Sequence, residues 1–198
     1  MIKVGLTGGI GSGKTTASNF FLDYGIPVYN SDTQGKILMN TNLDLRNDIV
    51  SMFGESVYSN GVLNTKILSN IVFSDSKKIE QLNNLVHPKV ADDFDYWTSK
   101  NKKHTILVKE AAILIESGSY LNMDKIILVV SEKSIRLNRI SKRDKSDLKS
   151  IEKRINLQMN DAEKLKYADY IIENNSSLNQ LKKEVLSVIR QIEENPKK

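Results

Sequence analysis

Short strand-like runs rich in hydrophobic residues recur along the chain, each about as long as a buried β-strand. They lie at residues 2–7, 26–29, 105–108, 125–130 and 170–172. Runs of this kind are typical of strands that are covered on both faces of a sheet. The apolar run at 126–130 is far shorter than the roughly 20 residues that a membrane-spanning helix needs. We therefore expect no association with a membrane.

Between these runs the hydrophobic residues recur every three or four positions, which predicts amphipathic helices. Such helices are expected at 14–24, 132–144, 146–159 and 178–192. Residues 31 to about 103 show helical patterns alone, and we expect one of these helices to end at His87-Pro88, because proline interrupts a helix. A strand, a helix and a second strand within the first thirty residues predict a parallel sheet with helical cover.

The composition is ordinary for a globular protein, with 39% hydrophobic and 27% charged residues in a chain of 198. This length suits one compact domain that carries small insertions. The net charge of +5, from 29 Lys and Arg against 24 Asp and Glu, fits either a nucleic acid or a phosphorylated small molecule as partner. Cysteine is absent, which excludes disulfides, thiolate catalysis and cysteine-bound metals. We recognise no export signal at the N-terminus and expect a cytoplasmic protein.

A glycine-rich segment follows the first predicted strand and precedes the first predicted helix. Residues 8–15 read Gly-Gly-Ile-Gly-Ser-Gly-Lys-Thr and match the phosphate-loop motif G-x-x-x-x-G-K-[ST]. The glycines let the backbone wrap an anion, and the helix start adds N–H groups and a positive dipole end. In such loops the lysine reaches the β- and γ-phosphates and the hydroxyl binds Mg²⁺. The motif predicts ATP and Mg²⁺ as cofactors, bound by Gly8, Gly9, Ile10, Gly11, Ser12, Gly13, Lys14, Thr15 and Thr16.

Phosphate loops occur in GTPases, motors, helicases and small-molecule kinases, and other segments discriminate between these classes. A GTPase is expected to carry Asn-Lys-x-Asp after a later strand, whereas the segment after Val130 reads Ser-Glu-Lys-Ser. A motor or helicase usually has a strand that ends in Asp-Glu, whereas the run at 105–108 leads to Lys109 and a single carboxylate, Glu110. The small size and the helical insertion favour a kinase.

At several short segments the chain resembles the dephospho-CoA kinase family, and the resemblance runs nearly end to end. Each segment is weak alone, but their order and spacing are specific. They are 6–14, Asn30-Ser-Asp32, Leu85-Val-His-Pro88, 110–116, 139–144, 154–158 and 168–175.

Two positions depart from the pattern of that family. The family usually has Asp-x-Asp after the second strand, where this chain has Asn30 before Asp32, and it usually has proline at the position of Ala112. The second acid is kept as Asp32. A role of the first acid is not carried over to Asn30.

The resemblance implies a three-layer α/β P-loop fold with a mostly parallel sheet. The implied core is 1–32 with 105–131 and 165–198, the helical acceptor-binding domain is 33–104, and the helical lid is 132–164. The implied activity is transfer of the γ-phosphate of ATP to the ribose 3′-hydroxyl of dephospho-CoA, which gives CoA and ADP in the last step of coenzyme A synthesis. Two alternatives stay open: another P-loop nucleoside or nucleotide kinase, and a P-loop regulatory or nucleic-acid-binding ATPase.

Asp32 follows the second strand, at the edge of a parallel sheet that also carries the phosphate loop. With the resemblance, we expect it to bind the acceptor hydroxyl as catalytic base or orienting group. It is also a candidate ligand for Mg²⁺, beside Thr15. The alternative from position alone is a helix N-cap, because the next helix starts at Ser31 or Asp32.

Three arginines, Arg136, Arg139 and Arg143, share one face of the expected helix at 132–144, because they are three and seven residues apart. Such a row supplies permanently charged donors to phosphates, whereas the alternative is a solvated surface helix. The resemblance favours Arg139 and Arg143, together with Lys14, as catalytic residues that contact phosphate or adenine. Arg136 is less favoured.

The remaining candidates rest on position and on the resemblance. Glu110 ends the third strand and is expected to hold a metal-bound water or to contact the substrate, with an ordinary surface glutamate as the alternative. His87 is a candidate substrate contact or a structural corner. Asn175, with Asn174, is a candidate adenine contact, although Asn is also common in turns. We expect a small-molecule substrate, no nucleic acid, and a monomer or weak homo-oligomer.

Overall fold

A computed structural model describes residues 1–144, 155 and 158–195 of the chain. The chain divides into two compact units. The first consists of Met1–Asn30 and Asn101–Lys198, and the second is the continuous segment Ser31–Lys100. The predicted helix at 146–159 lies outside the described residues except at 155, 158 and 159.

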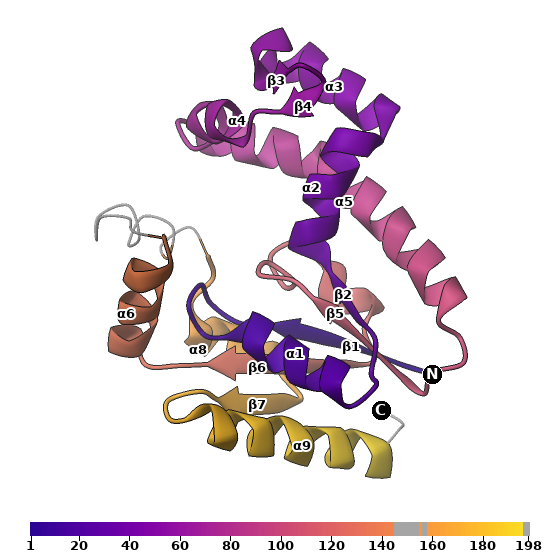
Figure 1. Cartoon of the computed structure of the whole chain (residues 1–198), viewed down its shortest axis with the longest axis vertical. Helices are drawn as coiled ribbons and strands as arrows, with labels where there is room; N and C mark the ends of the chain where they lie inside the picture. Colours follow the sequence, from indigo (N-terminus) through magenta and orange to yellow (C-terminus); the bar gives the residue numbers. More distant parts are fainter. Residues whose placement is uncertain (145–154, 156–157, 196–198) are drawn as a thin grey trace. The chain divides into compact units, whose positions relative to one another are not determined.

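The first unit is built on a five-stranded sheet with the order β2-β5-β1-β6-β7 (Figure 1). Its strands are β1 (Ile2–Thr7), β2 (Val28–Asn30), β5 (Ile106–Glu110), β6 (Lys125–Val130) and β7 (Tyr170–Glu173). All four neighbouring pairs are parallel, which confirms the predicted parallel sheet. The strands that follow β1 lie first on one side of it and then on the other. β1 therefore ends where the strand order reverses, which is the usual ligand site of open α/β sheets.

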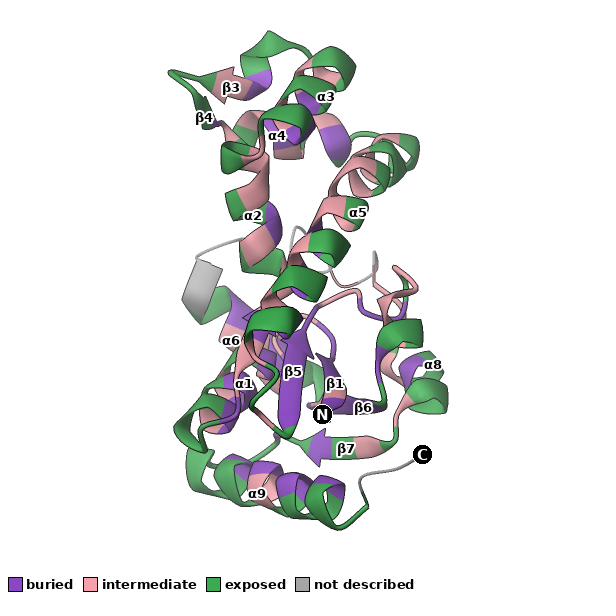
Figure 2. Cartoon of the chain, turned by 90° about the vertical axis from the view of Figure 1, so that its right-hand side faces the viewer, coloured by how far each residue is buried: buried purple, intermediate pink, exposed green. Residues whose placement is uncertain are grey.

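One face of this sheet packs against α1 (Lys14–Asp23) and α9 (Leu178–Glu194). Alternate residues of β1 point to this face, as the period of a strand requires. Figure 2 shows that β5 is buried along its length. The helices contribute residues at helical spacing, and burial of each such side chain stabilises the fold by about 1.5–3 kcal/mol. The core on this face includes Ile2, Val4, Leu6, Phe21, Val108, Ile127, Val129, Leu181, Val185 and Ile189.

The opposite face of the sheet is covered by the segment that follows β5. Leu114 and Met123 pack directly over Gly5 of β1. The short helix α8 (Asp161–Lys164) is fixed to the same segment by Lys164, which is fully buried. Its ammonium lies 3.0 Å from Glu116 Oε1 and donates to the Ala112 carbonyl across 3.2 Å. The first unit is completed by η2 (Ser119–Asn122), α6 (Lys133–Asp144) and η3 (Leu165–Tyr167).

The second unit is mainly helical and has its own core. Its elements are α2 (Ser31–Thr41), α3 (Leu43–Phe53), η1 (Glu55–Val57), β3 (Tyr58–Ser59), β4 (Val62–Leu63), α4 (Thr65–Val72) and α5 (Ser76–Lys100). The most buried residues of this core are Leu45, Ile49, Val57, Leu63, Leu68 and Val72.

Two predictions for this segment are wrong. β3 and β4 form an antiparallel hairpin, where the sequence predicted helices alone. The two residues between these strands, Asn60 and Gly61, both have positive φ angles, 49° and 82°, as the tightest hairpin turn requires. The Asn-Gly pair was a local signal for this turn.

The second error concerns the predicted helix end at His87-Pro88. α5 continues through Pro88 to Lys100. A proline within a helix removes one backbone hydrogen bond. Packing on both sides of the proline offsets this cost, because Val86 and Val90 both lie against Gly35 of α2.

Candidate active site

The phosphate-loop motif forms the connection between β1 and α1. The loop closes through a hydrogen bond from the Ser12 N–H to the Gly9 carbonyl, across 3.1 Å. Gly13 precedes the helix with φ 97°, a left-handed conformation that strongly favours glycine. The predicted order of strand, loop and helix is confirmed. The first N–H groups of α1 have no acceptor within the helix and carry its positive dipole end.

Lys14 lies over the inside of the loop. Its ammonium donates to the Gly8 carbonyl across 2.7 Å and to the Gly9 carbonyl across 3.3 Å, and the residue is 9% exposed. Within the described part of the chain, the Ser12 hydroxyl is buried without a hydrogen-bond partner. Such a buried donor costs free energy unless a ligand pairs with it. A cation, a buried hydroxyl and a helix N-terminus together make this turn suitable for a polyphosphate.

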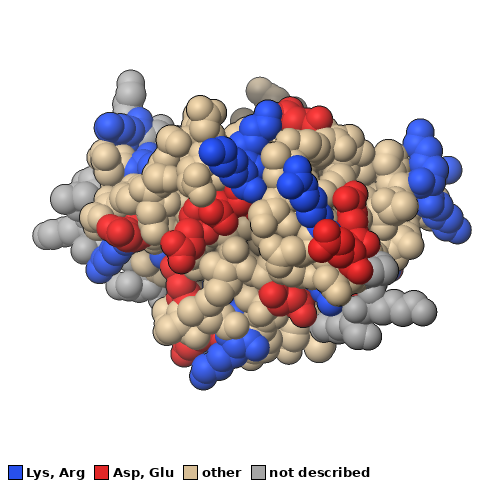
Figure 3. Space-filling view, turned by 90° about the horizontal axis from the view of Figure 1, so that it is seen from below, with Lys and Arg blue, Asp and Glu red and all other residues tan. Residues whose placement is uncertain are grey.

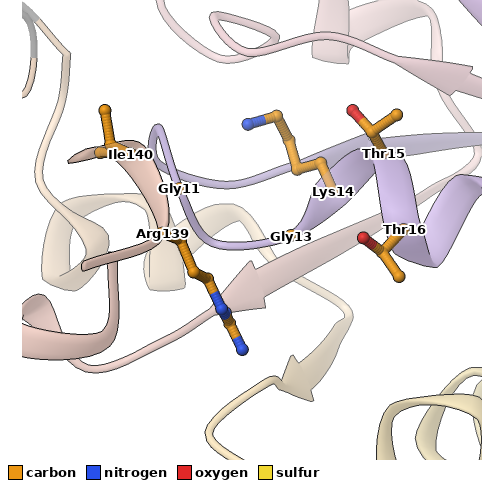
Figure 4. Close-up of a pocket in the computed structure, with 7 residues that line it drawn as sticks. All are labelled: Gly11, Gly13, Lys14, Thr15, Thr16, Arg139 and Ile140. Carbon is orange, nitrogen blue, oxygen red and sulfur yellow. The ribbon is translucent and has the colours of Figure 1, made fainter. Parts of the chain in front are cut away.

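A cavity of about 450 Å³ lies beside the loop (Figure 4). Figure 4 shows the Lys14 and Arg139 side chains pointing in opposite directions from this part of the chain. The volume is in the usual range for a small-molecule site. The cavity is lined by Gly11, Gly13, Lys14, Thr15, Thr16, Arg139 and Ile140.

Glu110 is the centre of a buried hydrogen-bond cluster below the loop. It is 3% exposed, and its Oε1 accepts from the Thr15 hydroxyl across 2.9 Å. Its Oε2 accepts from the Ser18 hydroxyl and from Asn30 Nδ2, each across 2.8 Å. A buried carboxylate needs such donors to offset its desolvation. The cluster joins α1, β2 and β5 at the carboxyl edge of the sheet.

Arg139 and Asn174 hold the other side of the loop. Asn174 is 5% exposed, and its Nδ2 donates to the Ser12 carbonyl across 2.8 Å. Its Oδ1 accepts from Arg139 Nη2 across 3.2 Å, and Arg139 Nη1 also donates to the Ser131 hydroxyl across 3.2 Å. Asn174 lies so close to Gly13 that any side chain at Gly13 would collide with it. The residue that follows β7 and the middle of α6 thus contact the loop together.

The other predicted site residues are divided between the two units of the chain. Asp32 lies in the first turn of α2 and His87 lies within α5, both in the second unit. Asn175 Oδ1 accepts from the Glu132 N–H across 2.8 Å, just before α6. Asn174, its neighbour, is the residue that contacts the phosphate loop. The backbone of Arg143 belongs to α6, but its side chain lies outside the described residues.

Ser18 and Asn30 were not predicted from the sequence as partners of Glu110. Ser18 follows Thr15 by three residues, so helical spacing could have placed both hydroxyls on one face of α1. Asn30 and Glu110 are register partners on adjacent strands, β2 and β5. No local signal gives that register, because the two strands are far apart in the chain.

The family model for dephospho-CoA kinase matches residues 2–180 of this chain. A dephospho-CoA kinase of Bacteroides fragilis strain YCH46 is 38% identical over 173 residues, which cover 87% of this chain and 84% of the relative. A crystal structure from Thermus thermophilus aligns with a TM-score of 0.84 and 27% identity, covering 96% of this chain and 97% of that chain. The dephospho-CoA kinase of Campylobacter jejuni aligns with a TM-score of 0.72 and 29% identity, covering 98% of each chain.

Proposed function

The chain belongs to the dephospho-CoA kinase family, and we propose how its residues divide the work of that reaction. The enzyme uses ATP to phosphorylate a hydroxyl of dephospho-CoA in coenzyme A synthesis. Neither alternative from the sequence, a different P-loop kinase or a regulatory ATPase, is favoured. Phosphoryl transfer asks a protein mainly to position the reactants and to neutralise charge.

The phosphate loop binds the donor nucleotide. Residues Gly8 to Thr16 surround the phosphates with backbone N–H groups, and the dipole end of α1 favours their negative charge. The Lys14 ammonium, which now bonds to two carbonyls of the loop, exchanges part of this bonding for the β- and γ-phosphates. The positive charge of Lys14 stabilises the transition state, because negative charge develops as the transferred phosphate separates from the leaving group.

Thr15 and Glu110 would hold the magnesium ion, and the hydrogen bond between them is the observation that carries the proposal. The described residues contain no group of three or more His, Cys, Asp or Glu side chains that could hold a metal ion by themselves. Mg²⁺ usually binds through one or two protein oxygens together with substrate phosphates and water, so a hydroxyl beside one carboxylate fits it. The ion, when bound, neutralises charge on the β- and γ-phosphates. The buried position of Glu110 favours this role over contact with the acceptor.

Asp32 binds the acceptor hydroxyl and takes its proton, or orients it. It follows the end of β2 by two residues, and β2 ends at Asn30, whose side chain bonds to Glu110. Asp32 is also in the first turn of a helix, where the positive end of the helix dipole stabilises the carboxylate. A role for Asp32 as a metal ligand is part of the same proposal.

Arg139 and Arg143 supply positive charge from the lid, 132–164. Arg139 lines the cavity beside the loop and is assigned to the nucleotide, with Asn175 near the adenine. Arg143 is one helical turn further along α6 and is assigned to the transferred phosphate. Closure of the lid would keep water, which competes as an acceptor, away from the donor phosphate.

The second unit, together with the flanking residues up to 104, binds dephospho-CoA. It is mainly helical and has a core of its own, which suits an inserted acceptor domain. His87 lies in its long helix α5 and is proposed as a substrate contact. We do not assign Glu110 to direct contact with dephospho-CoA. It affects the substrate only through Thr15 and the metal.

We propose that nucleic acid is not a partner. Figure 3 shows basic and acidic side chains interspersed on the face seen from below in Figure 1, rather than a continuous basic surface.

Among the helices that the structure describes, none is both long and apolar enough to cross a bilayer. We also propose a monomer or a weak homo-oligomer. A cytoplasmic location is proposed because the reaction consumes ATP.

The proposed function is tested by release of ADP in a coupled assay against a panel of acceptors. We expect turnover with dephospho-CoA and background rates with nucleoside monophosphates, DNA and RNA. Product analysis should show a new phosphate on the ribose 3′-hydroxyl. ATP turnover that nucleic acid stimulates and dephospho-CoA does not would refute the proposal.

A further inference from the structure

Ile10, at the tip of the phosphate loop, is held by side chains through both of its backbone polar groups. Its N–H donates to Gln158 Oε1 across 2.9 Å, and its carbonyl accepts from Arg136 Nε across 2.9 Å. Gln158 is 148 residues from Ile10 in sequence and Arg136 is 126 residues away. A carboxamide oxygen and a guanidinium N–H are the matching acceptor and donor.

Arg136 is itself fixed from a second direction. Its Nη1 forms a salt bridge of 2.9 Å with Asp161 Oδ2, and the arginine side chain in this pair is 11% exposed. The guanidinium lies against Gly9, where any Cβ would collide with it. α6 and the segment at 158–161 are therefore joined to each other by the ion pair and to the loop through Ile10.

These contacts act on the shape of the loop rather than on its ligand. The lining of the cavity includes Gly11, Gly13 and Lys14, which lie one, three and four residues after Ile10 in the chain. A glycine-rich backbone has much conformational freedom to lose when it wraps an anion. Fixing its tip before the ligand arrives lowers the entropy cost of binding.

We propose that Arg136 and Gln158 are positioning residues for nucleotide binding, which hold Ile10 so that the phosphate loop keeps its anion-binding shape. The proposal rests on the proposed function only in taking the loop as the nucleotide site. Neither side chain needs to touch the nucleotide. This role separates Arg136 from Arg139, although both belong to the same row of arginines on α6.

The first test is Gln158→Met, which keeps the length of the side chain and removes the acceptor. We expect the Kd for ADP, measured by titration calorimetry, to rise about three- to tenfold, as loss of one hydrogen bond implies. Amide hydrogen exchange should become faster in a peptide that covers the loop and stay unchanged in peptides from α9. The melting temperature without ligand should stay within about 2 °C of the original. Gln191→Met is the matched control, because Gln191 is an exposed carboxamide on α9, and it should change none of these values.

A double variant separates positioning from general loss of structure. Arg136→Met should also weaken ADP binding. Because both side chains act through Ile10, the combined loss should be smaller than the product of the two single losses. Gln158→Asn, shorter by one methylene, replaces Gln158→Met if the latter does not fold. ADP affinity and loop exchange at their original values in a folded Gln158 variant would overturn the proposal, as would fully multiplicative losses. All these measurements use ADP alone, so a failure of dephospho-CoA as acceptor would leave them unaffected.

Discussion

Asn30 Nδ2 donates to Glu110 Oε2 across 2.8 Å, and the two residues are register partners in the β2–β5 pair. The amide thus occupies the position of the family's usual first acid. An aspartate there would bring a second negative charge against a buried carboxylate and would remove a donor from it. The neutral amide lets Glu110 accept three hydrogen bonds, together with those from Thr15 and Ser18.

Asn30→Asp is expected to lower the melting temperature in the absence of magnesium, because like charges then meet in a buried cluster. Added Mg²⁺ should recover most of this loss, since a divalent cation compensates the extra charge. Thermal unfolding across a magnesium titration measures both effects. Asn19→Asp, on the exposed side of α1, is the matched control. Equal destabilisation at every magnesium concentration would contradict the prediction.

Glu110→Gln should raise the magnesium concentration needed for half-maximal turnover by about tenfold or more. Substitution of residues that support metal ligands typically lowers metal affinity by this amount. The amide also has one acceptor atom where the carboxylate has two. Calorimetry of ADP with and without Mg²⁺ gives an independent measure of the same loss. Glu184→Gln, on α9, should leave both measurements unchanged. An unaltered magnesium dependence would remove Glu110 from the metal site.

Asp32→Asn should reduce kcat about 100-fold or more, in the range expected for loss of a general base, while ATP still binds. The competing explanation is stabilisation of the helix N-terminus. Asp44→Asn tests it, because Asp44 lies in the first turn of α3 as Asp32 lies in that of α2. Turnover and ATP affinity are measured for both variants. Similar, small losses in both would assign Asp32 to the helix alone.

Asn174→Ala should weaken ADP binding about tenfold, because it removes the shorter of the two hydrogen bonds to the buried Ser12 carbonyl. The other, from Arg139 Nη1, is 3.5 Å long, and the substitution also removes the acceptor for Arg139 Nη2. Asn175→Ala removes the acceptor for the Glu132 N–H and should have a smaller effect. Calorimetric titration of both variants compares the two neighbouring candidates from the sequence, of which Asn174 contacts the loop. A larger loss of ADP affinity in the Asn175 variant would show that Asn175, rather than Asn174, contributes more to nucleotide binding.

Lys164→Met should lower the free energy of unfolding by about 2–3 kcal/mol. This is less than the usual cost of breaking a fully buried ion pair, because the Glu116 side chain is 21% exposed and water can still solvate it. Urea unfolding monitored by circular dichroism measures the change. Lys183→Met, at an exposed position of α9, should change stability by less than about 0.5 kcal/mol. A Lys164 variant as stable as this control would show that the ion pair makes no net contribution.

The sequence alone determined the parallel α/β core, the phosphate loop and the family. Each of these depends on residues that are close in the chain: a run of apolar residues makes a strand, and eight consecutive residues make the loop. The same local reasoning failed at Pro88, where helix packing outweighed the residue's own preference. It also failed at the Asn60-Gly61 hairpin, although that signal was local.

The tertiary structure decided which side chains support the loop. Asn30 contacts Glu110 because two strands share a register, and Asn174 contacts Ser12 because β7 ends beside the loop. Arg136 and Gln158 meet at Ile10 from positions far along the chain. Such contacts depend on the packing of whole elements, which neither motif spacing nor helical period encodes. A motif specifies the backbone that binds the ligand, whereas the fold selects the side chains that hold that backbone in place.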